Sequence, residues 1–145
     1  MPFIWADPKG QSGVRSDNIA QTHDIGSTIL EHAKIEPAIG MQGQVMAVAG
    51  GAPRNFAHIQ YETQRTQKAF GKRPRVHSII HENWRLSIYL GRCENELFDL
   101  SEDQHEMKNL WHEPDYADIK SMLIEKLAEA EIAAVDRAPL PTAEG

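Results

Sequence analysis

Residues 84–90 alternate between apolar and polar side chains, and this alternation constrains the fold more than any other feature of the sequence. The apolar positions are Trp84, Leu86, Ile88 and Leu90, and between them lie Arg85, Ser87 and Tyr89. A period of two predicts a β-strand that buries one face. Residues 75–80 and 96–100 are predicted to be strands on either side, each joined by a short connection. Consecutive strands with short connections favour an antiparallel meander.

Two further segments have the spacing of amphipathic helices. Ile25, Ile29 and Ala33 recur every four residues, so residues 23–34 are predicted to form a helix with one apolar stripe. A second helix of roughly five turns is predicted to begin at Pro114, because proline is tolerated in a first helical turn. Its stripe consists of Tyr116, Ile119, Leu123, Leu127, Ala130 and Ala134. We expect this second stripe to pack into a core.

The first half of the chain has weaker patterns. Residues 3–5 form a short apolar run before Asp7-Pro8 and are predicted to be a strand that ends in a turn. Residues 38–53 are rich in glycine and are predicted to be a long loop. Residues 55–62 are predicted to be a half-buried strand, since Ala57, Ile59 and Tyr61 share one face.

Composition excludes several classes of protein. The chain has 145 residues and a net charge of −6, with no basic tract, which argues against a partner that is nucleic acid or an anionic membrane. No apolar stretch approaches the roughly 18–20 residues of a membrane span, and no signal peptide can be read from the first residues. The localisation is therefore left open, and would be cytoplasmic if the chain were the complete product.

The residues alone predict no catalytic, cofactor-binding or metal-binding site. Among the seven histidines, His77 and His81 lie four apart on a predicted strand and its turn, where this spacing does not bring two rings together as it does on a helix. His23-Asp24 is interpreted as a pair at a helix start. His105 and His112, among acidic residues, are interpreted as parts of a solvated turn.

The search for a nucleophile gives the same result. Cys93 is the one cysteine and lies in Gly-Arg-Cys-Glu, where nothing would lower the pKa of a thiol. The sequence contains no Gly-x-Ser-x-Gly elbow and no glycine-rich phosphate loop. The residues thus predict a fold without an active site.

The order of these pieces resembles the C-terminal part of the sulfatases, in the alkaline-phosphatase-like superfamily. The resemblance covers roughly residues 2–133. It rests on Pro2-Phe3-Ile4-Trp5-Ala6-Asp7-Pro8, Thr22-His23-Asp24-Ile25-Gly26-Ser27-Thr28-Ile29-Leu30, Met41-Gln42-Gly43, Trp84-Arg85-Leu86-Ser87-Ile88-Tyr89 with Glu96-Leu97-Phe98-Asp99-Leu100, and Asn109-Leu110-Trp111. Ser27 and Gln104 stand where the family usually has proline, and Gln44-Val45 replaces its common Arg-Ser.

The resemblance implies an α/β fold of the alkaline-phosphatase type, represented here by its C-terminal portion. Residues 1–62 would be the end of the large α/β domain (strand, helix, strand), and residues 63–74 a linker. Residues 75–134 would be a small subdomain of antiparallel strands with a C-terminal helix, and residues 135–145 a disordered tail. The loops near His77, 81–83 and 92–95 would rim a pocket in the intact enzyme.

The resemblance also implies a function, the hydrolysis of a sulfate ester to an alcohol and sulfate by the intact enzyme. Its substrate would be a sulfated small molecule or glycan, and its cofactors a divalent cation (Ca²⁺ or Mg²⁺) and a formylglycine nucleophile. The family's Cys/Ser-x-Pro-Ser-Arg segment is not in this sequence, so this chain alone is expected to be inactive.

Two alternatives remain open. One is a fragment of a phosphodiester or phosphonate monoester hydrolase of the same superfamily. The other is a non-catalytic module that complements a separate N-terminal half.

Overall fold

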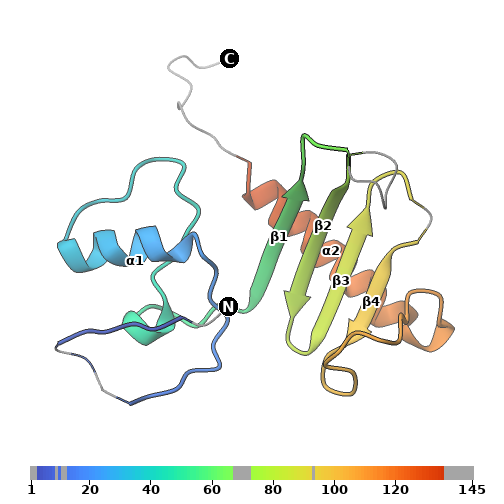
Figure 1. Cartoon of the computed structure of the whole chain (residues 1–145), viewed down its shortest axis with the longest axis horizontal. Coiled ribbons are helices and arrows are strands. Elements are labelled where there is room, and N and C mark those ends of the chain that lie inside the picture. The colour runs from blue at the N-terminus through green and yellow to red at the C-terminus, as the bar shows by residue number, and fades with distance from the viewer. Residues whose placement is uncertain (1–2, 9, 11–12, 67–72, 93, 136–145) are drawn as a thin grey trace. The chain divides into compact units, whose positions relative to one another are not determined.

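The computed structural model describes residues 3–8, 10, 13–66, 73–92 and 94–135 of the chain (Figure 1). It contains two compact units. The N-terminal unit comprises Met1–Asn55 together with Ala134–Gly145, and the sheet unit comprises Phe56–Ala133. The predicted tail of residues 135–145 lies almost wholly outside the described residues, as does Cys93.

The sheet unit contains a four-stranded antiparallel sheet whose strand order follows the chain, β1-β2-β3-β4 (Figure 1). The strands are β1 (Phe56–Glu62), β2 (Arg75–His81), β3 (Trp84–Tyr89) and β4 (Glu96–Asp99). The last three are the predicted meander. Leu86 of the alternating run is fully buried, as predicted, but Ser87 on the opposite face is only 1% exposed and is hydrogen-bonded to Ser78, so β3 is covered on both faces there.

The placement of β1 differs from the prediction that residues 55–62 belong to a large sheet with residues 3–5. β1 pairs with β2 along its whole length, from Phe56 opposite His81 to Glu62 opposite Arg75. The Thr63 N–H also donates to the Pro74 carbonyl (3.4 Å), so pairing continues beyond the strand. Residues 63–74 therefore join two strands of one sheet rather than two domains. The physical reason is that the backbone groups of β1 find their partners in the next strand along the chain.

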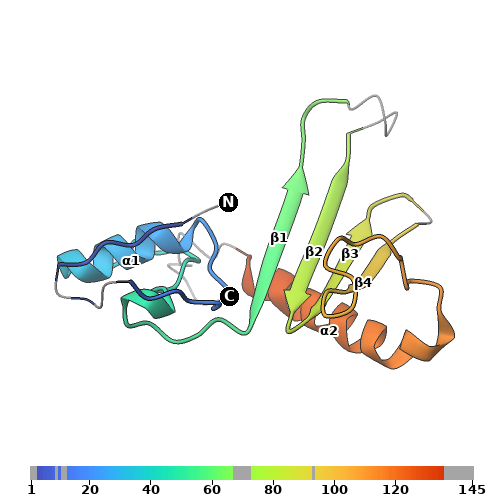
Figure 2. The ribbon, with the colours of Figure 1, turned by 60° about the horizontal axis from the view of Figure 1, so that its bottom comes forward.

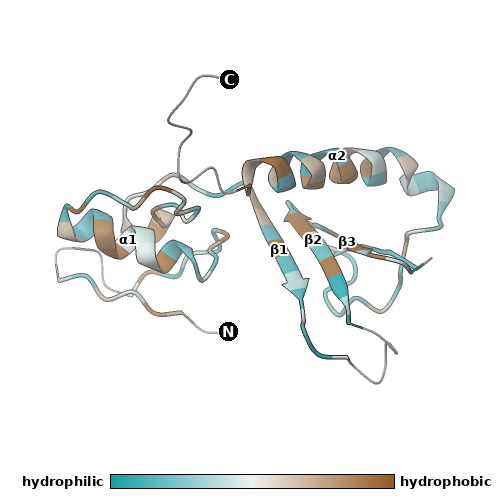
Figure 3. Cartoon of the chain, turned by 90° about the horizontal axis from the view of Figure 1, so that it is seen from above, coloured by the Kyte–Doolittle hydropathy of each residue, from teal (hydrophilic) through white to brown (hydrophobic). Residues whose placement is uncertain are grey.

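One face of the sheet is covered by α2 (Ala117–Ala133), which follows the short 3₁₀ helix η2 (Pro114–Tyr116) (Figure 2). Hydrophobic positions recur along α2 above the sheet (Figure 3). The buried core between these two layers consists of Ile79, Leu86, Leu97, Leu110, Leu123 and Leu127. Burying one such side chain is worth about 1.5–3 kcal/mol. The predicted stripe of the second helix is thus confirmed as core at Leu123 and Leu127, with Tyr116 and Ile119 packed against it, whereas Ala134 lies beyond α2.

The N-terminal unit contains α1 (Asp24–Ala33), the short 3₁₀ helix η1 (Ala47–Ala49) and an isolated bridge between Ile19 and Arg54. Residues 3–5, predicted to be a strand, have no regular secondary structure, and Ile4 is 88% exposed. A strand needs a neighbour for its backbone hydrogen bonds, and no described residue pairs with this segment.

The first helix is where it was predicted, but a different face is buried. Asp24, Ser27 and Thr28 are buried, whereas Ile29 of the apolar stripe is 53% exposed. Hydrogen bonds explain this orientation. The Ser27 hydroxyl donates to the Gly43 carbonyl (2.8 Å), and the Thr28 hydroxyl oxygen accepts the Met46 N–H (3.0 Å). Residues 43–46 therefore lie along the polar face of α1.

Gly43 is required by this close approach. A Cβ atom at this position would collide with the His23 carbonyl oxygen and with the Ser27 hydroxyl. The Ser27 hydroxyl could rotate away, but the His23 carbonyl is backbone at the start of α1 and cannot move aside as a side chain could. The glycine of Met41-Gln42-Gly43, part of the family resemblance, thus has a packing function in the N-terminal unit.

Candidate functional site

The candidate site of the sheet unit begins with three polar residues of β1. Side chains alternate along a strand, so His58, Gln60 and Glu62 share one face, opposite to Ile59. The register places Gln60 opposite His77 and Glu62 opposite Arg75. These residues continue the face whose Ile79 packs under α2. Edge strand β1 therefore turns its polar face towards the helix.

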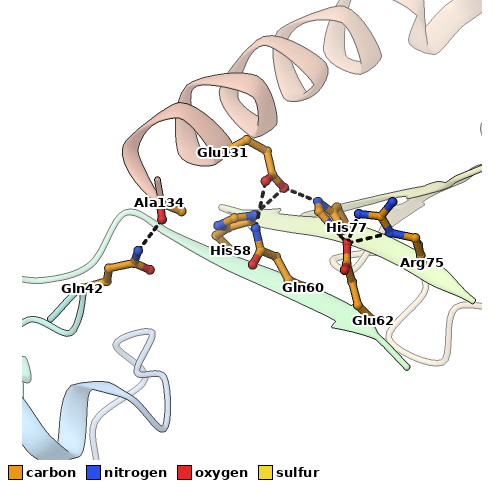
Figure 4. A network of polar contacts seen from close by, with 8 residues as sticks. All are labelled: Gln42, His58, Gln60, Glu62, Arg75, His77, Glu131 and Ala134. Carbon is orange, nitrogen blue, oxygen red and sulfur yellow. Dashed lines mark hydrogen bonds and ion pairs between the residues drawn. The ribbon is translucent and has the colours of Figure 1, made fainter. Parts of the chain in front are cut away.

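Glu131, in the last turn of α2, is the centre of the cluster (Figure 4). Its Oε1 atom lies 2.8 Å from Nε2 of His58 and 2.5 Å from Nδ1 of His77. Its Oε2 atom accepts a hydrogen bond from the Gln60 side-chain amide at 2.8 Å. One carboxylate thus connects the C-terminal end of α2 to both β1 and β2.

A second carboxylate fixes the outer side of His77. The Nε2 atom of His77 lies 3.1 Å from Oε1 of Glu62, so the two ring nitrogens face two different carboxylates. Arg75 holds Glu62 in turn, donating from Nε at 2.9 Å and from Nη2 at 2.6 Å. The ring of His77 is therefore oriented from both sides.

The cluster favours the ionised form of both carboxylates. Burial acts to raise the pKa of Glu131, but hydrogen bonds from His58, His77 and Gln60 outweigh it and hold that pKa below its ordinary value. The pKa of Glu62 is lowered mainly by the hydrogen bonds from Arg75, with a second contribution from His77. Both carboxylates are thus hydrogen-bond acceptors near neutral pH.

A groove of about 460 Å³ opens beside the cluster, between the sheet and α2. Its apolar wall includes Ile88, Leu90 and Leu127, and its polar end is formed by Glu62, Arg75, His77 and Glu131. Among the loops predicted to rim a pocket, the His77 position lines this groove, whereas residues 81–83 and 92–95 are not among its lining residues. That prediction concerned the cleft of the intact enzyme and stays a prediction.

The other histidines considered from the sequence lie apart from this cluster. His81 is on the strand of His77 but lies near Glu82, at 4.0 Å. His23 is the N-cap residue of α1 and lies 3.5 Å from Asp24, as the interpretation of a helix-start pair predicted. His105 is exposed in a turn where the Asp103 carboxylate accepts the Lys108 N–H at 2.8 Å.

A buried carboxylate in the N-terminal unit is fully occupied by hydrogen bonds. Asp24 is 1% exposed, accepts backbone N–H groups from Gln21 (2.9 Å) and Gln44 (3.0 Å), and pairs with the Arg54 guanidinium. Burial acts to raise the pKa of Asp24, but these hydrogen bonds and the Arg54 charge together lower it. Because hydrogen-bond donors already occupy its oxygens, Asp24 has a structural role in the N-terminal unit.

The described residues contain one set of side chains able to hold a metal ion. The ligand atoms of His58, His77 and Glu131 lie within 4.8 Å of one another. This donor set does not fit the Ca²⁺ or Mg²⁺ ion expected for the family, because these hard cations prefer oxygen ligands. No step of sulfate ester hydrolysis is therefore assigned to the cluster.

Comparison with known proteins identifies the family. Residues 1–133 match the family described as N-sulphoglucosamine sulphohydrolase, C-terminal. The chain therefore belongs to this family of sulfatase C-terminal regions. A curated relative, N-acetylglucosamine-6-O-sulfatase of Bacteroides thetaiotaomicron, is 26% identical over 96% of this chain and 26% of its own length. The chain spans about a quarter of the length of that relative.

Solved structures show that the fold is that of the C-terminal part of such enzymes. A phosphonate monoester hydrolase from Silicibacter pomeroyi has a TM-score of 0.77 and 19% identity, over 90% of this chain and 28% of its own. A protein solved in complex with its substrate D-glucosamine-2-N,6-O-disulfate has a TM-score of 0.66 and 21% identity, over 83% and 25% respectively. The predicted resemblance and fold class are confirmed.

Among the helices in the described part of the chain, none has both the length and the apolar character needed to cross a membrane.

The cluster of His58, His77 and Glu131 could not be predicted from sequence spacing, because His58 and Glu131 are 73 residues apart. The one available signal was the polar face of residues 58, 60 and 62, which alternates with the apolar face used to predict the strand.

Proposed function

We propose that this chain is the C-terminal portion of a sulfuric ester hydrolase, which converts a sulfate ester and water into an alcohol and sulfate. The observation that carries the proposal is the family match over residues 1–133. The curated sulfatase relative supports the same reaction. The proposed substrate is a sulfated small molecule or glycan, since one structural neighbour was solved with a sulfated glucosamine.

The chemistry of the proposed reaction is assigned to a part of the protein outside this sequence. In the intact enzyme a divalent cation would neutralise charge on the sulfate oxygens, and a formylglycine would supply the nucleophile. The required Cys/Ser-x-Pro-Ser-Arg segment is not in these 145 residues, and Cys93 is followed by Glu94-Asn95-Glu96 instead. We therefore expect the isolated chain to be inactive.

The experiment compares two proteins made from the same gene. One is the 145-residue chain, and the other is the product that also contains whatever coding sequence lies upstream of Met1. Both are assayed with an aryl sulfate for sulfate release. The proposal expects hydrolysis by the longer product only. Sulfate release by the purified 145-residue chain, or a longer product without any sulfatase activity, would contradict it.

A second candidate reaction is the hydrolysis of a phosphonate monoester. It is favoured by the TM-score of 0.77 with the Silicibacter pomeroyi enzyme. The fold does not separate the two reactions, because this chain resembles both kinds of enzyme at similarly low identity. Assaying the longer product with an aryl phosphonate beside the aryl sulfate distinguishes them, and the preferred substrate is the one with the larger kcat/KM.

The remaining alternative, a module that complements a separate N-terminal half, is motivated by exposed apolar residues of the N-terminal unit. Ile4 is 88% exposed, Ile39 is 71% exposed and Ile29 is 53% exposed. Apolar surface of this kind is typical of a face that another part of a protein covers. Sulfatase activity that appears only when two separately purified halves are mixed would support this alternative.

A further inference from the structure

We propose that His58, His77 and Glu131 form a binding site for a transition-metal ion, with Zn²⁺ as the expected occupant. The site lies at the C-terminal end of α2, where the helix packs on β1 and β2. The proposal does not depend on the proposed function, because binding is measured on this chain without turnover.

The first argument is the chemistry of the donor atoms. His58 Nε2, His77 Nδ1 and a Glu131 oxygen provide two imidazoles and one carboxylate within 4.8 Å of one another. Imidazole is a preferred ligand of zinc, copper, nickel and iron, whereas calcium and magnesium take oxygen. Two histidines and one glutamate are also the three protein ligands of some zinc sites that keep a fourth position open.

The second argument is the distance between the ligand atoms. A zinc ion forms bonds of about 2.0–2.2 Å, so the atoms around it are separated by at most about 4 Å. The separations from the Glu131 oxygen, 2.8 Å to His58 Nε2 and 2.5 Å to His77 Nδ1, lie below this limit and are hydrogen-bond distances, so the side chains would move slightly apart to admit an ion. Small side-chain rotations complete the site, and the metal replaces the protons shared by the rings and the carboxylate.

The third argument is the outer layer of hydrogen bonds, which a simple ion pair does not need. A metal-bound histidine usually donates its other ring N–H to a carboxylate, which fixes the tautomer and the ring orientation. His77 has this arrangement, since its Nε2 atom lies 3.1 Å from Glu62, which is itself held by Arg75. Gln60 likewise holds the second oxygen of Glu131 at 2.8 Å.

The fourth argument is the electrostatic environment. The C-terminal end of a helix carries partial negative charge and favours a nearby cation. The last turn of α2 contains no basic residue, and the three ligands are partly buried, with side-chain exposures of 12% for His58, 28% for His77 and 31% for Glu131. A cation here is thus attracted by the helix end and by Glu131, and one side remains accessible from solvent.

The test is titration of the metal-free 145-residue chain with Zn²⁺ in a calorimeter, with Ca²⁺ as a second probe. We expect one Zn²⁺ per chain and no comparable binding of Ca²⁺. His58→Ala and His77→Ala should each weaken Zn²⁺ binding by at least about tenfold, and Glu62→Gln by about 10–100-fold through the outer layer. The matched control is His105→Ala, which removes an exposed histidine from a turn and should leave the affinity unchanged.

Glu131→Gln keeps the size of the side chain but removes its charge, so it serves where an alanine variant fails to fold, as judged by circular dichroism. Substitution with Co²⁺ gives a second readout, because the visible absorption of bound Co²⁺ reports its coordination geometry. Absence of stoichiometric Zn²⁺ binding, or binding that survives His58→Ala, His77→Ala and Glu131→Gln alike, would overturn the proposal. The contacts would then serve only to fasten α2 to the sheet.

Discussion

The helices of the two units bury opposite kinds of side chain. The sheet unit buries an apolar core between its sheet and α2, centred on Ile79, Leu86 and Leu123, which are fully buried. In the N-terminal unit the buried face of α1 is polar, formed by Asp24, Ser27 and Thr28, and Ile29 is half exposed. An apolar core is stable through area removed from water, whereas a polar interior depends on every hydrogen bond being made. We therefore expect the units to respond differently to mutation and to pH.

The largest expected effect is the removal of the Asp24 charge. Asp24→Asn leaves the Arg54 guanidinium, whose side chain is only 10% exposed, without its ion-pair partner. Breaking a buried ion pair on one side costs about 3–5 kcal/mol. Amide hydrogen exchange should show loss of protection in the N-terminal unit but not in the sheet unit. The matched control is Asp17→Asn, where the side chain is 94% exposed and no change is expected.

Leu123→Ala is the corresponding test of the apolar core in the sheet unit. It removes a fully buried side chain of α2 and should destabilise the sheet unit by about 2–5 kcal/mol. Hydrogen exchange in β2 and β3 measures the effect, and Ile132→Ala, at a position that is 75% exposed, is the control. Equal loss of protection in both units would show that they unfold together, and the contrast drawn between them would then fail.

A smaller effect is expected from Thr28→Val, which preserves shape and removes one hydroxyl. The substitution leaves the Met46 N–H without the oxygen it donates to, and Met46 is 4% exposed. An unsatisfied buried donor costs about 1–3 kcal/mol. Chemical denaturation monitored by amide hydrogen exchange in residues 43–46 measures this cost. The control is Thr22→Val, because Thr22 is exposed. Unchanged stability would mean that the buried polar face of α1 tolerates the loss of one hydrogen bond.

The most gradual effect is expected on acidification. The pKa of Asp24 is lowered in the folded chain, so its contribution to stability is present above the ordinary value of about 3.9 and is lost as the pH falls through the folded value. The N-terminal unit should therefore lose exchange protection first. In the sheet unit, acid removes the Glu131 contacts at the end of α2, while the apolar core carries no charge. If β3 lost its hydrogen-exchange protection before α1 as the pH falls, the expected order would be wrong.

Much of the fold could be predicted because its signals are local. The alternation of residues 84–90 gave β3, and the spacing of Leu123 and Leu127 gave the buried face of α2. The position of β1 could not be predicted from its own residues, because a half-buried strand fits either sheet and only its pairing with β2 decides. The apolar stripe of Ile25 and Ile29 predicted the wrong buried face of α1, since hydrogen bonds between α1 and residues 43–46 select the polar face.

The candidate site could not be predicted from the sequence for a different reason. In the sequence His77 is spaced four residues from His81 on the same strand, whereas its partners in the structure are on β1 and on α2. The link between His77 and Glu131 spans 54 residues and depends on where the last turn of α2 crosses the sheet. Only the register of the hairpin and the docking of the helix bring these side chains together.

The strand order of the sheet has a consequence for how quickly the unit assembles. Because β1, β2, β3 and β4 pair in the order in which they are synthesised, strand pairing joins neighbouring parts of the chain, and local contacts favour fast folding. The contacts of α2 with the sheet are less local, and the one between His58 and Glu131 joins the first strand to the last helical turn. We therefore expect the end of α2 to dock after the folding transition state. Glu131→Gln should then accelerate unfolding and leave the folding rate nearly unchanged, which stopped-flow measurements can resolve.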